Sequence, residues 1–227
     1  MKDQSGSGHT IDGYIYKSSD FTGAHSYLLP ALAKEVKAAF HSQPDQPKRL
    51  FDLGCGNGSV AGYLHDIGYE VVGVDPSHEG IKIAGETRPD MRLEVGSAYD
   101  DLAKKYGRFA CVYSLEVVEH VYAPRDYAAT LFDLTEPGGT AIVSTPYHGY
   151  IKNLAMAVTG KLDAHFTVLW DHGHIKFWSI RTLTTLLQEA GFENIRFVRV
   201  GRVPMLAKSM IAIASRPKQQ SVTEQKP

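Results

Sequence analysis

Three glycines at alternate positions follow a short apolar run that contains an acid near its end. The run is Arg49–Leu53, with the acid at Asp52, and the glycines are Gly54, Gly56 and Gly58. Glycine lacks a Cβ and tolerates positive φ, so such a backbone can turn tightly and lie directly against a ligand. We interpret the run as a buried strand and the glycines as a turn into a helix, which is where nucleotides usually bind in α/β sheets.

A second acid, Asp75, ends the next apolar run, at a spacing from the glycine turn that fits a carboxylate binding ribose hydroxyls. A dinucleotide fingerprint requires a glycine at position 59, where this chain has Ser59. Asp52 also disfavours a pyrophosphate, which binds backbone N–H groups, and suits a cation better. S-adenosylmethionine carries a sulfonium and an ammonium but no phosphate, so it fits the pattern. The alternative is a glycine turn that serves packing alone.

A second group of chemically capable residues follows the apolar run Phe109–Ser114. Glu116, Glu119 and His120 stand at i, i+3 and i+4, and on a helical turn their side chains share one face. Two carboxylates and an imidazole at a cleft can bind a divalent cation. Two other interpretations stay open: Glu119 or His120 is a general base towards a hydroxyl group, or the pair only braces the start of a helix.

Alternating apolar runs and amphipathic segments are expected to position these residues. Predicted strands are 49–53, 70–74, 92–95, 109–114, 140–144, 194–200 and 207–214, and predicted helices are 28–40, 59–67, 78–86, 127–134 and 180–190. Residues 116–121 are expected to form a loop that enters a helix. The alternation, with a final hairpin, predicts an α/β fold with a doubly wound, seven-stranded, mostly parallel sheet. The glycine turn and the 116–120 segment are then expected at the same edge of that sheet.

The composition is that of one globular unit with balanced charge. The 227 residues suit one domain, 13–216, between tails at 1–12 and 217–227 that we expect to be mobile. A hydrophobic fraction of 43% suffices for a full core, and a net charge of −1 gives no reason to expect a nucleic-acid partner. Cys55 and Cys111 form no disulfide framework, and no apolar run nears the roughly 20 residues that span a bilayer. We therefore expect a cytoplasmic protein, whose oligomeric state the sequence does not specify.

Residues 147–178 interrupt the alternation and are rich in aromatic and histidine side chains. An insertion after the fifth strand lies over the ligand edge of such a sheet, so we expect an aromatic lid for a flat, partly apolar small substrate. The alternative is a small hydrophobic subdomain packed on the sheet. Residues 151–158 have the pattern of one or two amphipathic turns. With Lys152 and Lys161 as their basic neighbours, they offer at most weak contact with a membrane surface.

These motifs together resemble the ubiquinone-biosynthesis O-methyltransferases (the UbiG type) among the class I S-adenosylmethionine-dependent methyltransferases. Residues 49–58 resemble motif I of that superfamily, and Asp75 resembles the acid of its motif II. The UbiG type is matched by Glu116–Val121, Pro137-Gly138-Gly139, Ser144-Thr145-Pro146 and the stretch from His174 to Phe192. The resemblance covers roughly residues 50–215 and implies a Rossmann-like fold.

The resemblance also implies roles for individual residues. The implied contacts of S-adenosylmethionine are Asp52, Gly54, Cys55, Gly56, Asn57, Asp75, Pro76, Ser97, Ala98 and, through its backbone, Leu115. In the family, the positions of Glu116, Glu119 and His120 are associated with a magnesium-type site. Small-RNA 3′-terminal 2′-O-methyltransferases pair a similar element with a later histidine, and His174 fits that position. The implied ligands of Mg²⁺ or another divalent cation are therefore Glu116, Glu119, His120 and His174, and the catalytic candidates are Glu119, His120 and His174.

Two positions depart from the family pattern. The family has a basic residue in the N-terminal helix for the carboxylate of the cofactor, and this chain offers His25, Tyr27 and the earlier Lys17 near that place. The third-strand motif reads Gly96-Ser97-Ala98 where an acid near the adenine is usual. Ser97 or backbone groups would then make that contact.

The prediction is an S-adenosylmethionine-dependent enzyme that methylates a hydroxyl of a small phenolic, catecholic or quinone-like metabolite by in-line displacement, with possible assistance from a metal. The alternatives are N-methylation of a small molecule, 2′-O-methylation at an RNA 3′ end, and cofactor binding without turnover. Arg196, Arg199, Arg202 and Lys208 gather near the C-terminus, as an RNA groove would require. Their alternation on a predicted strand favours a solvated face instead.

Overall fold

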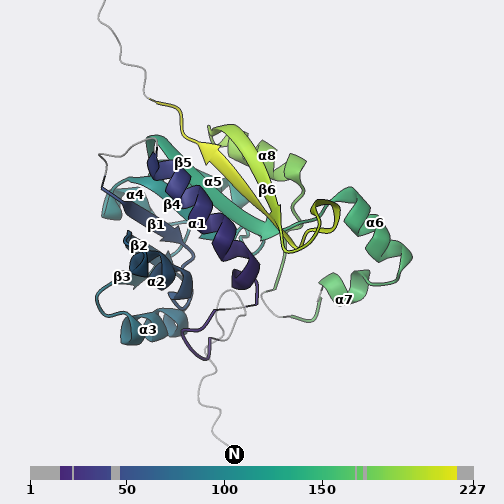
Figure 1. Ribbon diagram of the computed structural model, residues 1–227, viewed down its shortest axis with the longest axis horizontal. Coiled ribbons are helices and arrows are strands. Elements are labelled where there is room, and N and C mark those ends of the chain that lie inside the picture. Colours follow the sequence, from purple (N-terminus) through teal and green to yellow (C-terminus); the bar gives the residue numbers. More distant parts are fainter. Residues whose placement is uncertain (1–15, 22, 42–46, 167, 171–172, 219–227) are drawn as a thin grey trace, which may run out of the picture.

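A computed structural model describes residues 16–218 apart from 22, 42–46, 167 and 171–172. The described residues form one seven-stranded sheet in the order β3-β2-β1-β4-β5-β7-β6 (Figure 1). The strands are β1 (Arg49–Leu53), β2 (Glu70–Asp75), β3 (Arg92–Val95), β4 (Phe109–Leu115), β5 (Thr135–Pro146), β6 (Glu193–Val200) and β7 (Ser209–Ser215). The helices are α1 (His25–His41), α2 (Ser59–Asp66), α3 (His78–Thr87), α4 (Leu102–Tyr106), α5 (Pro124–Leu134), α6 (Tyr150–Val158), α7 (Leu162–Phe166), α8 (Ile180–Glu189) and the 3-10 turn η1 (Pro204–Leu206).

The sheet is parallel from β3 to β5 and antiparallel around β7. Strand β1 pairs in parallel with β2 and β4, while β7 runs antiparallel to both β5 and β6. The α/β class, the mostly parallel sheet and the final hairpin predicted from the sequence are confirmed. The carboxyl ends of β1, β2 and β4 therefore share one edge, as expected for a ligand-binding edge.

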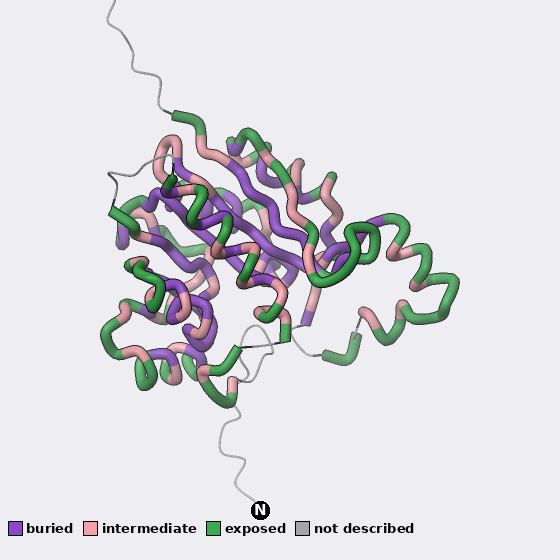
Figure 2. Tube along the Cα trace, viewed as in Figure 1, coloured by how far each residue is buried: buried purple, intermediate pink, exposed green. Residues whose placement is uncertain are grey.

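The two faces of the sheet bury separate apolar cores, which makes the fold doubly wound. Leu50 on β1 belongs to the core under α1, α2 and α3, whereas Phe51 and Leu53 belong to the core under α4, α5 and α8. Figure 2 shows the buried strands between helices whose outer faces are exposed. Strands buried on both faces read as continuous apolar runs, which is why the sequence revealed them.

Several predicted boundaries differ from those of the structure. Residues 116–123 form the expected loop, and α5 begins at Pro124, a residue suited to the first helical position, rather than at Tyr127. Strand β5 begins at Thr135 and includes Pro137-Gly138-Gly139, with a register shift against β4 between Phe109 and Cys111. The short helices α4 and α7 were not predicted.

Helices α6 and α7 form an arm that projects beside the sheet (Figures 1 and 2). Neither helix has a buried residue, whereas Tyr147, His148 and Trp178 at the base of the arm are buried. The insertion after β5 is thus present, and its closure over a ligand stays a prediction. His172 and the expected tails at 1–12 and 219–227 lie outside the described residues. Within the described ranges, no helix combines the length and apolar character needed to cross a bilayer.

Candidate active site

The glycine turn after β1 is held by backbone hydrogen bonds. Gly54, Gly56 and Gly58 have φ angles of 97°, 53° and 75°. The N–H groups of Gly54 and Cys55 donate to the carbonyl of Val74 on β2, at 2.8 and 3.0 Å. Because φ in this range strains other L-residues, the three glycines are needed for the turn itself.

The carboxylate of Asp75 is fixed against this turn. Its Oδ2 accepts from the N–H of Gly56 at 2.8 Å, and its Oδ1 accepts from the N–H of Ser77 at 2.8 Å. Asp75 is buried, so these bonds fix the orientation of the carboxylate at the edge of the sheet.

Asp52 is an almost fully buried carboxyl group below the same turn. Burial, reinforced by the charge of Asp75, raises the pKa of Asp52 to about 8, and the neighbouring phenol of Tyr113 opposes this shift. A cation bound nearby would favour the ionised form and lower that pKa again. The position therefore suits a positively charged ligand, as the sequence suggested.

One cavity of about 680 Å³ opens above these residues. All ten residues predicted to contact the cofactor line it: Asp52, Gly54, Cys55, Gly56, Asn57, Asp75, Pro76, Ser97, Ala98 and Leu115. Glu116, His120 and His174 line the same cavity. The cofactor turn and the second group of residues therefore share one chamber, although they come from separate parts of the chain.

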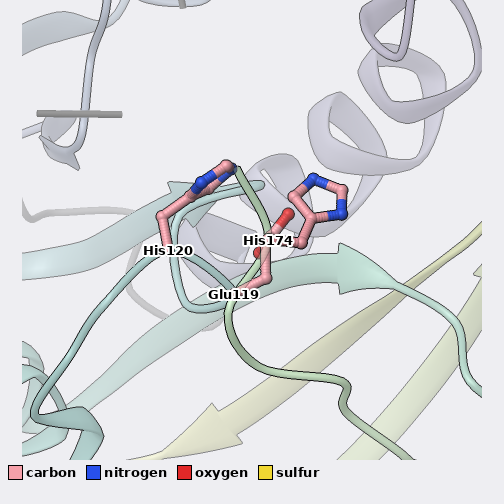
Figure 3. A group of neighbouring side chains, drawn as sticks. All are labelled: Glu119, His120 and His174. Atoms are coloured by element: carbon pink, nitrogen blue, oxygen red, sulfur yellow. The ribbon is translucent and has the colours of Figure 1, made fainter. Parts of the chain in front are cut away.

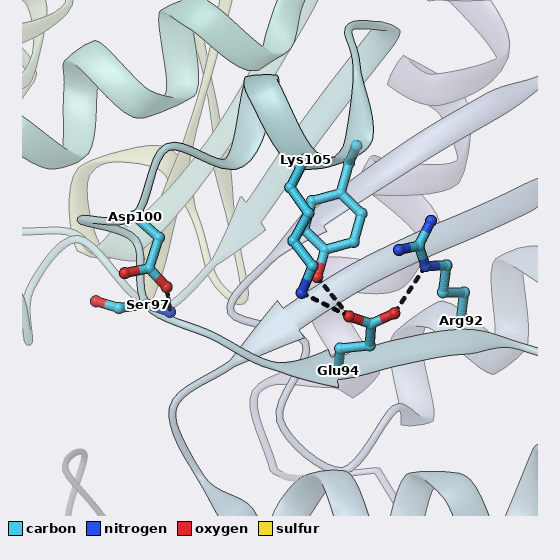
Figure 4. Close-up of polar contacts among 6 residues, drawn as sticks. Arg92, Glu94, Ser97, Asp100 and Lys105 are labelled. Carbon is cyan, nitrogen blue, oxygen red and sulfur yellow. Dashed lines mark hydrogen bonds and ion pairs between the residues drawn. The ribbon is translucent and has the colours of Figure 1, made fainter.

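The loop after β3 contains an acid, Asp100, that the sequence analysis missed. The carboxylate of Asp100 accepts from the N–H of Ser97 at 2.7 Å (Figure 4). Figure 4 also shows Glu94 accepting from Arg92, Lys105 and Tyr106, which ties β3 to α4. Asp100 holds the turn that presents Ser97 and Ala98 to the cavity. Its position three residues after Ser97 fits an acid that reaches back to the N–H of the residue three before it, as in a capping box, and this spacing was the available signal.

Glu119, His120 and His174 form a compact group of potential metal ligands (Figure 3). One ligand atom of each lies within 4.8 Å of the others. Glu119 is fully buried, and neither of its carboxylate oxygens has a hydrogen-bond partner among the described residues. Burial, reinforced by the charge of Glu116, raises the pKa of Glu119 well above its usual value. Such an unsatisfied buried carboxylate is costly unless a proton or a cation compensates it.

Backbone contacts bring His174 to this group from 54 residues away in the sequence. The N–H groups of Ile175 and Lys176 donate to the carbonyl of Glu119, at 2.9 and 3.0 Å. The indole of Trp178 donates to the carbonyl of Val118 at 3.0 Å. Burial, and secondarily the neighbouring His120, lowers the pKa of His174 to about 4, so its imidazole is neutral near pH 7 and able to bind a metal.

Glu116 lies outside this group, and the shared helical face predicted for residues 116–120 is not formed. Glu116 has a positive φ of 56°, and its carboxylate accepts from the hydroxyls of Ser144 and Ser209, at 2.8 and 3.3 Å. Burial raises the pKa of Glu116 to about 7. The structure thus brings together three of the four predicted ligands, and the role of Glu116 stays a prediction.

Residues from two further parts of the chain complete the cavity wall. His25 and Tyr27, two of the three residues offered for the carboxylate of the cofactor, line it from the N-terminal side together with Tyr16, whereas Lys17 is not a lining residue. Burial lowers the pKa of His25 to about 4, so this side chain is uncharged near neutral pH. Lys208 lines the cavity with its Nζ over the ring of Tyr27, 5.2 Å from the centroid. Tyr16 and Lys208 lie outside the sequence motifs, and no local sequence pattern indicates that they meet at this cavity.

Comparison with known proteins agrees with this geometry. The family model of the methyltransferase domain matches residues 24–196. A protein named ubiquinone biosynthesis O-methyltransferase from Caulobacter sp. (strain K31) is 35% identical, over 62% of this chain and 56% of that protein. Its namesake from Dinoroseobacter shibae is 32% identical, over 74% of this chain and 70% of that protein. The chain therefore spans between 56% and 70% of the length of these two relatives.

Solved structures share the fold at lower identity. The CurJ carbon methyltransferase superposes with a TM-score of 0.62 at 14% identity, over 83% of this chain and 54% of that one. The magnesium protoporphyrin IX methyltransferase from Synechocystis PCC 6803 gives 0.59 at 20% identity, over 82% of both chains. At these identities the similarity concerns the fold alone.

Proposed function

The chain belongs to the S-adenosylmethionine-dependent methyltransferases, and from that premise we propose that it methylates a hydroxyl group of a small phenolic, catecholic or quinone-like metabolite with the help of a divalent cation. The observation that carries this proposal is the group of Glu119, His120 and His174, whose two histidines line the chamber that also holds the glycine turn. The names of the relatives from Caulobacter and Dinoroseobacter support the same class of acceptor.

The residues around the glycine turn fit S-adenosylmethionine. Asp52 and Asp75 place two carboxyl groups near a ligand with a sulfonium and an ammonium, and the turn offers backbone without side chains. A Cβ at Gly54 would collide with Val117, which itself lines the cavity. A side chain at position 54 would therefore compete for space with a wall of the chamber.

The residues on the acceptor side fit a divalent cation. The two oxygens of Glu119 have no hydrogen-bond partner among the described residues, and a cation beside them would compensate the charge of the ionised carboxylate. A bound Mg²⁺ or similar ion would lower the pKa of an acceptor hydroxyl and orient its oxygen. Two imidazoles beside one carboxylate leave other divalent metals open as well.

The chain itself contributes positioning and proton handling. Methyl transfer forms a bond from the acceptor oxygen to the methyl carbon while the carbon–sulfur bond breaks and its electrons stay on sulfur. The two reacting partners must therefore be held close, in line and away from bulk water, which can supply roughly 7–11 kcal/mol of the acceleration in favourable systems. With a cation held by His120, the proton of the hydroxyl would leave to solvent once the cation lowers its pKa. Without a cation, His120, which lines the chamber beside His174, is the candidate base for that proton.

The RNA alternative receives less support from the described surface. Arg196 forms an ion pair with Glu35, and the guanidinium of Arg199 lies over the ring of Tyr147. These cations are thus engaged within the protein rather than arranged along a groove. N-methylation needs no metal, so the Glu119 group would have no role in it.

The test is methyl transfer from radiolabelled S-adenosylmethionine to a panel of catechols, phenols, hydroquinones, amines and 3′-terminal RNA. The proposal expects label in the hydroxylated aromatic compounds, on oxygen by mass spectrometry of the product. Exclusive labelling of amines or of RNA would replace it with the corresponding alternative.

A further inference from the structure

The chain before α1 crosses the glycine turn, where one buried side chain of the turn binds it. This strap, defined here as residues Tyr16–Asp20, lies next to α3 in Figure 1. The side-chain amide of Asn57 donates to the carbonyl of Ser18 at 2.7 Å and to the carbonyl of Asp20 at 3.0 Å. Both donor hydrogens of the Asn57 amide are therefore used to hold the strap, although Asn57 sits in a motif expected to contact the cofactor.

The strap also places an aromatic ring directly on the turn. A Cβ at Gly56 would collide with the hydroxyl of Tyr16, and a Cβ at Gly80 would lie 3.1 Å from the Tyr16 ring. Gly56 and Gly80 thus leave the space that Tyr16 occupies. Tyr16 lines the cofactor cavity together with Gly56 and Asp75, so the ring forms part of its wall.

Apart from these contacts, most residues of the strap are exposed on the surface. Lys17, Ser18 and Asp20 are exposed, and Phe21 after them is 51% exposed. In contrast, Asn57 is only 4% exposed. A segment with little buried surface opens at low cost in free energy, so a few specific hydrogen bonds can decide how often it is open.

We propose that Asn57 is a positioning residue that fastens the strap and its Tyr16 ring across bound S-adenosylmethionine and thereby sets the rate of cofactor release. A ligand held between the turn and the strap can leave only when the strap lifts. The bonds from Asn57 to Ser18 and Asp20 must break in that movement. This inference concerns the cofactor alone and does not depend on which acceptor is methylated or on a metal.

The discriminating variant is Asn57→Asp. It preserves the shape of the side chain and the oxygen that accepts from the N–H of Ser59 at 3.3 Å, but replaces the donor with an oxygen facing two carbonyls. Ser59→Ala is the matched control, since it removes from the same turn a buried hydroxyl that has no hydrogen-bond partner among the described residues and leaves the strap untouched. Dissociation of S-adenosylhomocysteine from the full chain is measured by stopped-flow displacement, and its affinity is measured by calorimetry.

The expected result is a release rate about tenfold higher in Asn57→Asp, in line with the loss of two hydrogen bonds, and an unchanged rate in Ser59→Ala. Tryptic cleavage after Lys17 reports the strap directly: S-adenosylhomocysteine should protect this site in the native protein and fail to do so in Asn57→Asp. Tyr16→Ala, which keeps Asn57 and its backbone bonds, should also accelerate release and serves if Asn57→Asp does not fold. Equal release rates in all variants, or an equal acceleration in Ser59→Ala, would overturn the proposal.

Discussion

The two ends of the cavity are built in different ways. At the end with the glycine turn, Gly54 donates to the backbone of Val74 and Gly56 donates to the carboxylate of Asp75, so consecutive strands fix the turn. At the other end, Glu119 and His174 meet through contacts between segments more than 50 residues apart. Beyond them lies an arm without buried residues.

This difference separates what is constant in the reaction from what varies. The donor is the same for every S-adenosylmethionine-dependent methyltransferase, and a turn of fixed backbone geometry suits a ligand that does not vary. The acceptor end consists of side chains on long loops, where function is commonly altered without disturbing the fold. Membership of the family thus identifies the donor, and the acceptor must be inferred from side chains such as Glu119, His120 and His174.

The largest contrast is expected from the same substitution at two glycines with positive φ. Gly54→Ala should destabilise the protein by about 2–5 kcal/mol, since the strained backbone costs about 1–2 kcal/mol and the collision with Val117 about 1–3 kcal/mol more. Gly160→Ala, between α6 and α7, should cost only about 1–2 kcal/mol because a Cβ there has open space. Urea unfolding measures both. Equal losses would mean that the turn is no more tightly packed than the arm.

His174→Ala tests the acceptor end. Turnover should fall at least about 100-fold, because the residue is a proposed metal ligand, while the affinity for S-adenosylhomocysteine changes less than about twofold. Steady-state kinetics and calorimetry separate the two effects, with the outlying His65→Ala as the control. A loss of cofactor affinity equal to the loss of turnover would show that the two ends are not independent.

A smaller effect is expected from the buried acid Glu116. Its pKa is raised from 4.5 to about 7 by burial, so the folded protein keeps a proton that the unfolded chain releases. Stability should therefore decrease as the pH rises from about 4.5 to about 7, and Glu116→Gln should reduce that decrease. Unfolding free energies at pH 5 and 7.5 give the comparison, with exposed Glu86→Gln as the control. An identical pH dependence in wild type and Glu116→Gln would contradict the shift.

The smallest effect is expected on the arm. Leu154 on α6 is 56% exposed, so Leu154→Ala should change stability by less than about 0.5 kcal/mol. The same change at Leu53, which is fully buried on β1, should cost about 2–5 kcal/mol. Thermal or chemical unfolding measures the loss of stability in both variants. A large loss at Leu154 would indicate that the arm packs on a surface absent from a single chain.

The difference between the two ends also explains what the sequence could predict. The glycine turn and Asp75 depend on neighbouring residues and on the period of buried strands, so their roles were visible in local patterns. The conformation of Glu116 depends on Ser144 and Ser209, which lie 28 and 93 residues away. No local pattern contains that information, and the predicted helical face was wrong for this reason.

The strap shows a second limit. Asn57 binds backbone carbonyls of Ser18 and Asp20, and any residue type supplies a carbonyl. Asp100 was missed in a similar way, because its partner is the backbone N–H of Ser97. Side-chain motifs predicted which residues face the cavity, but contacts made to the backbone required the folded chain.

The most direct test of the central claim is the dependence of turnover on a divalent cation, measured on an acceptor that the panel identifies. Chelator should abolish methyl transfer, added Mg²⁺ or Mn²⁺ should restore it, and binding of S-adenosylhomocysteine should be the same in both conditions. In Glu119→Gln, which removes the ionisable carboxylate, added metal should no longer restore turnover. Full activity in chelator with undiminished turnover in Glu119→Gln would contradict a metal-assisted reaction at Glu119, His120 and His174.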